Sequence, residues 1–470
     1  MRDNTFTHIP MRMDSFSCIR ELEVTHCSLS SLPSEFMLLE TLQVCRLNNN
    51  LFSLWPVSLM SLEGLTEIDM SHNTLTRLDE ACLLRHPALK ILRLESNALE
   101  HVGVEILHYT PELTELSLHH NQLHSLNLTI SRDKDKETHH PLTQLLLHDN
   151  RLATPTLPWE HCPKLSLVTL HNNLCATFPI VQLSEAVGLK ELQLANNLIQ
   201  SLPSMAWMQT AAGTLQTLHL KACKLQSLPS QMDLPSLTFL NLSDNQLSAL
   251  PTGLSRSPLV RVDVSFNRFG TIDIGLYRQS KLKELNLSRN AIEEVTSECS
   301  RWESLERLEC QFNKIASLPD ELGRCTHLQH CDFSFNSLER LPATLAKLQQ
   351  LKQLEVGHNR LKSIPETVSS LASLKTLYLN HNAIVTLPQS LSRAAALEFL
   401  DCSENQLLVI FDSLSKIATL KVLNLASNNL AEIPASFKYL THLKVYLRGN
   451  EPLLANAVRL GLNECPHIYL

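Results

Sequence analysis

Large apolar residues recur along this chain in a fixed short pattern, and an asparagine follows each pattern at a fixed distance. In the most regular stretch these anchors are 23 residues apart, at Asn290, Asn313, Asn336, Asn359, Asn382, Asn405 and Asn428. Around each stands the frame LxxLxLxxNxLxxLP; one copy is Leu374, Leu377, Leu379, Asn382, Ile384, Leu387 and Pro388. The LxL core predicts a short strand whose leucines point inward, because side chains alternate along a strand.

The same frame extends over nearly the whole chain. The other anchors are Asn4, Cys27, Asn50, Asn73, Asn97, Asn121, Asn150, Asn173, Asn197, Cys223, Asn245, Asn267 and Asn450. A period of about 20–29 residues with this frame is typical of a leucine-rich repeat, in which each unit buries its leucines only against its neighbours. We therefore predict an α/β solenoid. It is a leucine-rich-repeat horseshoe with a parallel β-sheet on the concave face and mostly 3₁₀ or extended convex segments.

The repeat also predicts the domain organisation. Residues 1–451 hold about 19 full repeats and a partial first one, and residues 452–470 follow helical spacing that predicts a C-terminal cap. A charged insertion is expected at 131–140, SRDKDKETHH, where the anchor spacing lengthens. Met1 takes the last leucine position of a strand, so the chain begins halfway through a repeat. We expect a fragment that lacks an N-terminal cap, or another chain that covers this end.

Composition narrows the classes of function. The net charge of −7 does not favour a nucleic-acid partner, and no apolar run approaches the length of a membrane span. The 13 cysteines are an odd number, and several take apolar repeat positions. Secreted proteins of this repeat class usually carry cysteine-rich caps, which this chain lacks. A reduced, cytoplasmic protein is predicted.

The residues expected on the concave face form columns across neighbouring repeats. Between the two strand leucines the column includes Asp263, Glu309, Asp332, Glu355, Tyr378 and Asp401, and just before the anchors lie Phe266, Phe312, Phe335, His358 and His381. Like charges abreast destabilise a sheet, and exposed phenylalanines are common interface anchors. One interpretation is a binding surface for a partner with a basic and apolar segment, formed by the first six residues with Phe266, Phe312 and Phe335. The other is a solvated acidic face relieved by Lys352, Lys375 and Arg307.

Candidate chemistry is otherwise sparse. His119, His148 and His171 occupy one column in three successive repeats, flanked by His120 and Asp149, and are weak candidates for a transition-metal site. We predict no metal, no cofactor and no small-molecule substrate. The sequence contains no GxxxxGK[ST], GxGxxG, HExxH or GxSxG motif, so an enzyme is not predicted.

The repeat unit resembles that of the intracellular Ras-group leucine-rich-repeat proteins, which include Ras suppressor, Erbin and Scribble. The likeness is clearest in NKIASLPDELGRCTHL and NSLERLPATLAKLQQL. It implies a scaffold or adaptor that binds a protein on its concave face in intracellular signalling. The chain lacks the PDZ domains of Erbin and Scribble. Two alternatives stay open: the regulatory repeat region of a kinase, phosphatase, cyclase or ubiquitin ligase, and a structural subunit of a cytoskeletal or other large assembly.

Overall fold

The computed structural model describes residues 7, 9, 18–128, 139–179, 187–202, 213–230, 232–455, 457 and 459–470. Its chain forms two compact units, Met1–Asn241 and Leu242–Leu470. Met1, Asn4 and most of the insertion expected at 131–140 lie outside the described residues. At the end of that insertion His140 is buried, and its ring Nε2 lies 2.9 Å from the carbonyl oxygen of Thr110.

Short parallel strands, one from each repeat, form the sheet of the first unit. They pair in register with the strand of the next repeat, so that Glu21 lies opposite Val44 and Glu191 opposite Thr217. The strands are β1 (Glu21–Glu23), β2 (Val44–Arg46), β3 (Glu67–Asp69), β5 (Ile91–Arg93), β7 (Glu115–Ser117), β8 (Gln144–Leu146), β9 (Leu167–Thr169), β10 (Glu191–Gln193), β11 (Thr217–His219) and β12 (Phe239–Asn241). A second, two-stranded parallel sheet joins β4 (Arg77–Leu78) to β6 (His101–Val102).

The second unit repeats this arrangement with greater regularity. Its strands are β13 (Arg261–Asp263), β14 (Glu284–Asn286), β15 (Arg307–Glu309), β16 (His330–Asp332), β17 (Gln353–Glu355), β18 (Thr376–Tyr378), β19 (Phe399–Asp401), β20 (Val422–Asn424), β21 (Lys444–Tyr446) and β22 (Ile468–Tyr469). The central residue of most strands is a leucine, and Leu285, Leu308 and Leu354 are at most 1% exposed. The predicted leucine-rich-repeat solenoid with a parallel sheet is therefore confirmed.

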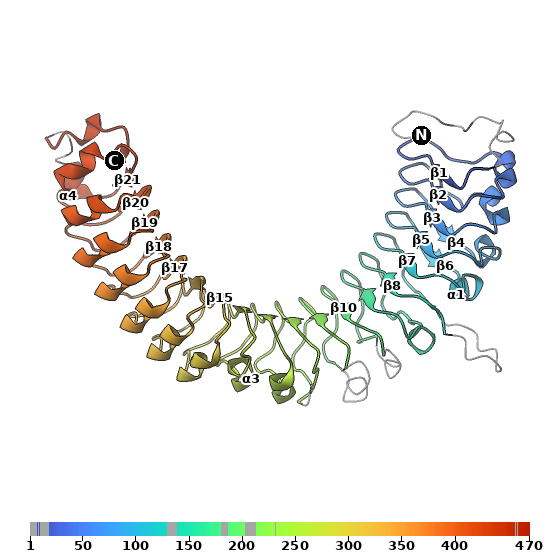
Figure 1. Cartoon of the computed structure of the whole chain (residues 1–470), viewed down its shortest axis with the longest axis horizontal. Coiled ribbons are helices and arrows are strands. Elements are labelled where there is room, and N and C mark those ends of the chain that lie inside the picture. The colour runs from blue at the N-terminus through green and yellow to red at the C-terminus, as the bar shows by residue number, and fades with distance from the viewer. Residues whose placement is uncertain are drawn as a thin grey trace. The chain divides into compact units, whose positions relative to one another are not determined.

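Helical turns return the chain to the next strand on the opposite side of each repeat (Figure 1). Most are single 3₁₀ turns. In the first unit they are η2 (Ser34–Leu38), η3 (Val57–Ser61), η4 (Glu80–Cys82), α1 (Ile106–Tyr109) and η5 (Trp159–His161). In the second they are η8 (Thr252–Arg256), α3 (Ile274–Tyr277), η9 (Ser297–Arg301), η10 (Asp320–Arg324), η11 (Ala343–Lys347), η12 (Glu366–Ser370), η13 (Gln389–Arg393), η14 (Asp412–Lys416), η15 (Ala435–Tyr439), α4 (Glu451–Leu454) and η16 (Leu462–Glu464).

The "LP" pairs in the sequence set where these turns begin. Pro319, Pro342 and Pro365 each precede a 3₁₀ turn in an extended conformation. Proline fits there because its φ is fixed near the required value and this position needs no backbone donor. The third residue of each of these turns, such as Leu322 or Leu345, is buried. Proline spacing and leucine spacing thus act together to place each turn.

The anchor asparagines hold neighbouring repeats together. The Asn382 Nδ2 donates to the carbonyl oxygens of Val356, Leu379 and Asn380 at 3.0, 2.9 and 3.2 Å, and its Oδ1 accepts from Leu361 N at 2.9 Å. Cys223 replaces asparagine, and its Sγ lies 3.1 Å from the carbonyl oxygen of Leu194. Each anchor therefore satisfies backbone groups that the strand leaves unpaired.

The residue before each described anchor has a positive φ, as at His120, Phe312 and Ser427 (52°, 56° and 53°), and at Gly449, before the anchor Asn450, it reaches 74°. This left-handed conformation ends the strand. Because it recurs in successive repeats, the side chains at this position form a column of their own beside the sheet.

The C-terminal segment adds a strand to the sheet. After α4 and η16 the chain forms β22, whose Ile468 and Tyr469 pair with Val445 and Tyr446. Leu453 and Leu462 are buried beneath it. In the parts of the chain that the structure describes, no helix has the length and apolar character needed to cross a bilayer.

A glycine in a 3₁₀ turn provides a test of how tightly the repeats stack. A Cβ on Gly323 would lie 2.3 Å from the carbonyl oxygen of Thr344 in the next repeat, whereas one on Gly270 would meet nothing within 4 Å. We expect Gly323→Ala to lower the free energy of unfolding by about 1–3 kcal/mol, as overpacking against backbone usually does. Gly270→Ala is the matched control. Equal stability of the two variants in urea denaturation would contradict close contact between η10 and η11.

Candidate functional site

The column between the strand leucines of the second unit is continuous. The strand register places Asp263, Asn286 and Glu309 side by side, followed by Asp332, Glu355, Tyr378, Asp401 and Asn424. We call the positions of Asp263, Glu309, Asp332, Glu355, Tyr378 and Asp401 the acidic column. All are partly exposed on the sheet face. The structure therefore brings together the carboxylates that the sequence predicted to be neighbours.

Three successive carboxylates in this column, those of Glu309, Asp332 and Glu355, are poorly compensated. Burial raises the pKa of Asp332 above its ordinary value, and the neighbouring Glu309 adds to the rise. Burial likewise raises the pKa of Glu355, with repulsion from Asp332 as the next cause. Arg307 pairs with Glu309 through its Nε at 2.6 Å. Among the described residues, no lysine or arginine forms an ion pair with Asp332 or Glu355.

The two lysines expected to relieve the column are engaged elsewhere. Lys352 Nζ donates to Gln329 Oε1 at 2.8 Å, and Lys375 Nζ lies 3.5 Å from Glu398. Among the described residues, neither lysine forms an ion pair with Asp332 or Glu355. Arg307 pairs with Glu309 and also opposes the rise in the pKa of Asp332 and Glu355, so the alternative interpretation, an acidic face relieved by its own cations, holds in part through Arg307.

In the sheet of the first unit, arginines and glutamates on neighbouring strands neutralise one another through ion pairs. Arg46 Nε lies 2.8 Å from Glu67, and Arg93 lies 3.3 Å from Glu67 and 2.9 Å from Glu115. Arg46 also pairs with Glu21. Acid and base alternate across β1 to β7, which is the favourable arrangement for charges on adjacent strands. The acidic column lacks this alternation.

Part of the acidic column has a structural role that the sequence analysis missed. Asp332 Oδ1 accepts from the backbone N and the hydroxyl of Ser334 at 2.8 and 2.6 Å. The same contacts join Asp263 to Ser265 and Asp401 to Ser403. These bonds stabilise the end of the strand. The recurring D-x-S triplets could have revealed this role. The second carboxylate oxygen of Asp401 also accepts a hydrogen bond, from Asn424 Nδ2 at 3.1 Å.

Beside the acidic column, the residues before the anchors stack into an aromatic ladder of Phe266, Arg289, Phe312, Phe335, His358 and His381. Ring centroids are 4.1 Å apart for Phe312 and Phe335, 3.9 Å for Phe335 and His358, and 3.8 Å for His358 and His381. The ladder ends where His381 Nδ1 lies 2.8 Å from Glu404. Continuous stacking gives the second unit a flat aromatic edge.

Arg289 is a ladder member that the sequence analysis did not identify. Its guanidinium carbon lies 4.9 Å from the ring centroid of Phe266 and 4.0 Å from that of Phe312, so it bridges two rings. Such cation–π contacts are favourable. The residue occupies the same position before its anchor as the phenylalanines, and reading that column without regard to residue type would have found it.

The phenylalanines of the ladder sit where the backbone disfavours them. Phe266, Phe312 and Phe335 have φ of 53°, 56° and 53°, a conformation that small polar residues and glycine adopt more readily. Phe266 and Phe335 are also 52% and 39% exposed. Two features of these phenylalanines lower stability: the exposed apolar surface and the unfavourable backbone φ. Such destabilising features are concentrated at functional sites.

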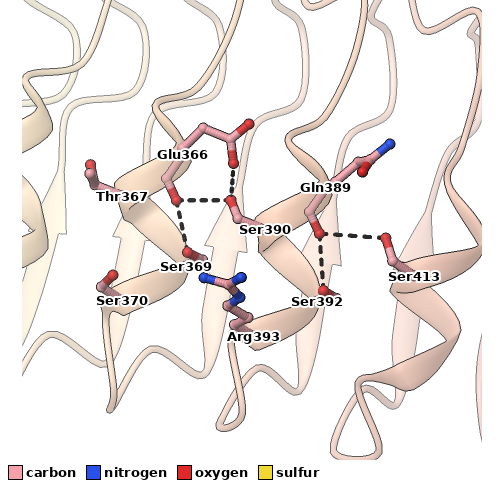
Figure 2. A pocket seen from close by; sticks show the side chains of 9 residues that line it. All are labelled: Glu366, Thr367, Ser369, Ser370, Gln389, Ser390, Ser392, Arg393 and Ser413. Atoms are coloured by element: carbon pink, nitrogen blue, oxygen red, sulfur yellow. Dashed lines mark hydrogen bonds between the residues drawn. The ribbon is translucent and has the colours of Figure 1, made fainter.

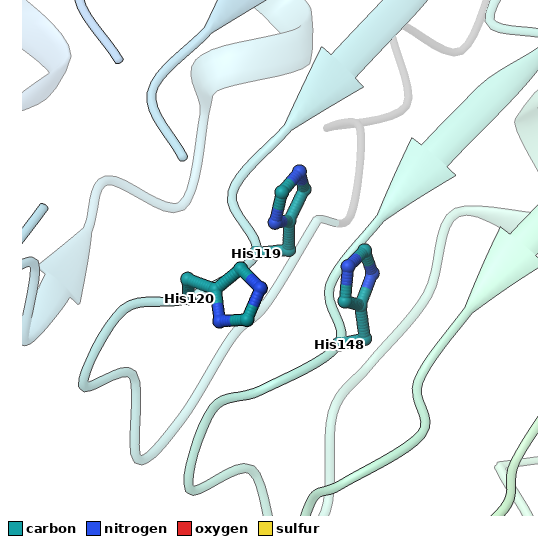
Figure 3. Close-up of side chains that lie close together, drawn as sticks. All are labelled: His119, His120 and His148. Carbon is teal, nitrogen blue, oxygen red and sulfur yellow. The ribbon is translucent and has the colours of Figure 1, made fainter. Parts of the chain in front are cut away.

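In the first unit, His119, His120, His148, Asp149 and His171 form a compact histidine tract. Figure 3 shows three of its side chains, those of His119, His120 and His148. His119 and His148 stack with centroids 4.1 Å apart, and His148 and His171 stack at 4.3 Å. Burial lowers the pKa of His119 to about 4, with His120 as the next cause, and burial with repulsion from His119 lowers the pKa of His148 to about 4. These imidazoles are therefore neutral at neutral pH.

A shallow hollow lies on the other side of the second unit, between η12, η13 and η14 (Figure 2). Serine and threonine hydroxyls line this hollow, and some of them donate hydrogen bonds to carbonyl oxygens of the preceding turn. Ser390 donates to the carbonyl oxygen of Glu366 at 3.0 Å, and Ser413 to that of Gln389 at 3.5 Å. These hydroxyls therefore connect adjacent repeats, and this structural role explains why they line the hollow.

All thirteen cysteines are free thiols, and ten of them are buried. Burial raises the pKa of Cys45, Cys162 and Cys175 to about 12. They act as small apolar groups in the core, as their positions in the repeat predicted.

Comparison with known proteins identifies the repeat but no narrower group. Models described as leucine-rich repeat match residues 38–99, 236–257, 350–407 and 419–440. Among curated proteins, the chain is 27% identical over 232 residues to human podocan-like protein 1, covering 48% of this chain and 43% of that protein. It is 25% identical over 265 residues to the zebrafish transforming growth factor beta activator LRRC33, covering 53% and 34%. The matches span less than half of either relative.

Solved structures share the fold at low sequence identity. A leucine-rich-repeat protein of Leptospira interrogans superposes with a TM-score of 0.72 at 24% identity, covering 84% of this chain and 99% of that one. The Arabidopsis receptor kinase HAESA, solved with the peptide hormone IDA and the co-receptor SERK1, gives 0.64 at 24% identity, covering 94% and 71%. Toll, in the Drosophila Toll–Spatzle complex, gives 0.68 at 19% identity, covering 91% and 60%.

These comparisons overturn one prediction. The cytoplasmic location expected from the absence of cysteine-rich caps is wrong, because the relatives and receptors that the chain resembles are extracellular or membrane-associated. Buried thiols in repeat positions report on packing. They do not report on the compartment in which the chain resides.

Proposed function

We propose that this leucine-rich-repeat chain is a non-catalytic binding protein that holds a basic and apolar segment of a partner protein against the sheet face of its second unit. The observation that carries the proposal is the run of Glu309, Asp332 and Glu355, which are partly buried, abreast and without enough cations of their own. A bound lysine or arginine would supply the missing charge.

The aromatic ladder supports the apolar half of the proposal. Exposed aromatic side chains next to charged ones are the usual composition of interface hot spots. Phe312 and Phe335 lie in the same repeats as Glu309 and Asp332, so one ligand segment would meet both sets. Arg289 already packs against two rings of the ladder, so a ligand guanidinium would find a similar environment along this edge.

Known proteins of this fold support a peptide or protein ligand. HAESA was solved with a peptide hormone and Toll with Spatzle. The likeness to them is one of fold, so the chemistry of the ligand is inferred from the acidic column alone.

Peptide titration tests the proposal. The full chain would be titrated with three labelled peptides of equal length: one alternating arginine and leucine, one with glutamine in place of arginine, and one with glutamate. We expect only the first to bind with saturation, and its affinity should fall as salt rises. Equal affinity for all three peptides would overturn the proposal.

Variants of the ladder locate the binding. Phe312→Ala with Phe335→Ala should weaken the arginine–leucine peptide about tenfold, as loss of interface aromatics does. Tyr439→Ala is the matched control, because Tyr439 is 81% exposed on η15, outside the sheet face. Unchanged affinity in the ladder variant would exclude this edge as the apolar contact.

A further inference from the structure

The metal-ligand candidates suggested by the sequence, His119, His148 and His171, do not include His120, which approaches Asp149 more closely than His148 does. His119, His148 and His171 are stacked, with interplanar angles of 12° between neighbours. Among the described residues, these three rings do not by themselves form a group of mutually close ligand atoms. His120 instead lies edge-on to His148 at 76°. Its Nε2 is 3.5 Å from Asp149 Oδ2, and the Nε2 of His148 is 3.9 Å from the same oxygen.

These separations are close to those of a metal site. Ligand atoms about 2.0–2.1 Å from a tetrahedral ion lie about 3.3–3.4 Å from one another. The separations of Asp149 Oδ2 from His120 Nε2 and from His148 Nε2, 3.5 and 3.9 Å, are close to this spacing. His119 and His171 stack on His148. The ligand atoms of His119, His120 and His148 lie within 4.8 Å of one another, and so do those of His148, Asp149 and His171.

Surrounding contacts orient the three groups. His148 Nδ1 lies 2.8 Å from Thr169 Oγ1, which leaves Nε2 directed at Asp149. Asn172 Nδ2 donates to Asp149 Oδ1 at 2.7 Å, and Asn196 Nδ2 donates in turn to Asn172 Oδ1 at 2.6 Å. Metal-binding histidines and carboxylates usually have such partners on their far side, because the partners fix ring orientation and raise ligand basicity.

Two further nitrogens lack partners. In the part of the chain that the structure describes, His119 Nδ1 and His171 Nδ1 are buried and accept or donate no hydrogen bond. A buried polar atom without a partner is costly, and coordination would satisfy one of them. The backbone of the tract is well placed for this, since His120 and Asp149 both occupy the left-handed position that ends a strand.

We propose that His120, His148 and Asp149 bind a divalent transition-metal ion of the zinc type, with His119 or His171 as the fourth ligand. Two or three imidazoles with one carboxylate suit Zn²⁺ and neighbouring ions of the series. Ca²⁺ and Mg²⁺ prefer oxygen ligands throughout. The site lies on the first unit and is independent of peptide binding by the second.

Zinc titration of the full chain, without an affinity tag and after treatment with a chelator, tests this site. We expect a single Zn²⁺ ion per chain by calorimetry. His148→Gln and Asp149→Asn should each weaken binding at least about tenfold to a hundredfold, and Asn172→Ala about tenfold, as loss of an orienting partner does. The matched control is His358→Gln with His381→Gln, which removes a stacked pair that is not part of a convergent group.

Cobalt substitution identifies the ligands. Co²⁺ should give the strong visible absorption of a four-coordinate ion without the near-ultraviolet band of thiolate coordination. This result would separate the histidine tract from the thirteen free thiols. Circular dichroism of each variant without metal shows whether the fold is kept, and Asn172→Ala, which removes no ligand, covers the case in which a ligand variant fails to fold. No saturable binding, or binding that survives both His148→Gln and Asp149→Asn, would overturn the proposal.

Discussion

Asn405→Ala is expected to destabilise the second unit by about 3–5 kcal/mol, because one substitution leaves several buried backbone groups without a partner. Asn405 is 8% exposed. Its Nδ2 donates to the carbonyl oxygens of Leu379, Cys402 and Ser403 at 2.9, 3.1 and 3.1 Å, and its Oδ1 accepts from Ile384 N at 3.0 Å. Alanine offers none of these contacts.

Two further variants make the result specific. Asn429→Ala removes an exposed asparagine one position after an anchor and should change stability by less than about 0.5 kcal/mol. Asn405→Cys should fall between the two, because the cysteine at the anchor position 223 still donates to a carbonyl oxygen. Hydrogen exchange should quicken most in β18, β19 and β20, since a repeat array transmits the loss mainly to its neighbours. Equal loss in Asn405→Ala and Asn429→Ala would contradict the role of the anchor.

The anchor also explains why so much of the fold could be predicted from the sequence. A strand of three residues, an anchor asparagine and, in most repeats, a proline before the turn recur with one period, and each requires a particular residue type. The period therefore predicts the parallel strands and the 3₁₀ turns. It could not predict that the residue before the anchor is left-handed, because His120, Phe312 and Ser427 share that conformation without sharing chemistry.

The candidate sites were predicted less completely for the same reason. Columns can be read from the repeat register, so the acidic column and the stacking of Phe312 on Phe335 follow from the sequence. Contacts between columns cannot be read in this way. The approach of His120 to Asp149 depends on side-chain direction, which the left-handed residue changes at the end of each strand.

Neutralising Glu309, Asp332 and Glu355 together, as Glu309→Gln, Asp332→Asn and Glu355→Gln, is expected to weaken the arginine–leucine peptide about thirtyfold. Three lost charge contacts of about 0.7 kcal/mol each amount to about 2 kcal/mol. The amides keep the size of the side chains, and the amide oxygen introduced by Asp332→Asn would still accept from Ser334. The matched control is Glu293→Gln, Glu339→Gln and Glu432→Gln, which removes three exposed carboxylates elsewhere in the same unit.

The same triple variant should be more stable than the native chain at neutral pH, by about 1 kcal/mol, because like charges on adjacent strands no longer repel.

The sign of the pH dependence of stability follows from the pKa shifts of Asp332 and Glu355. Asp332 and Glu355 have folded-state pKa values above their ordinary 3.8 and 4.5, so the folded chain binds more protons than the unfolded chain in the window just above those values. The native chain should therefore gain stability from these two groups as pH falls through that window, while peptide binding weakens as the carboxylates protonate. Urea denaturation and peptide titration at matched pH values would measure both trends, and the triple variant should lose this contribution to each. A native chain whose stability and affinity rise or fall together across this window would show that the acidic column is held by contacts within the protein and does not await a basic partner.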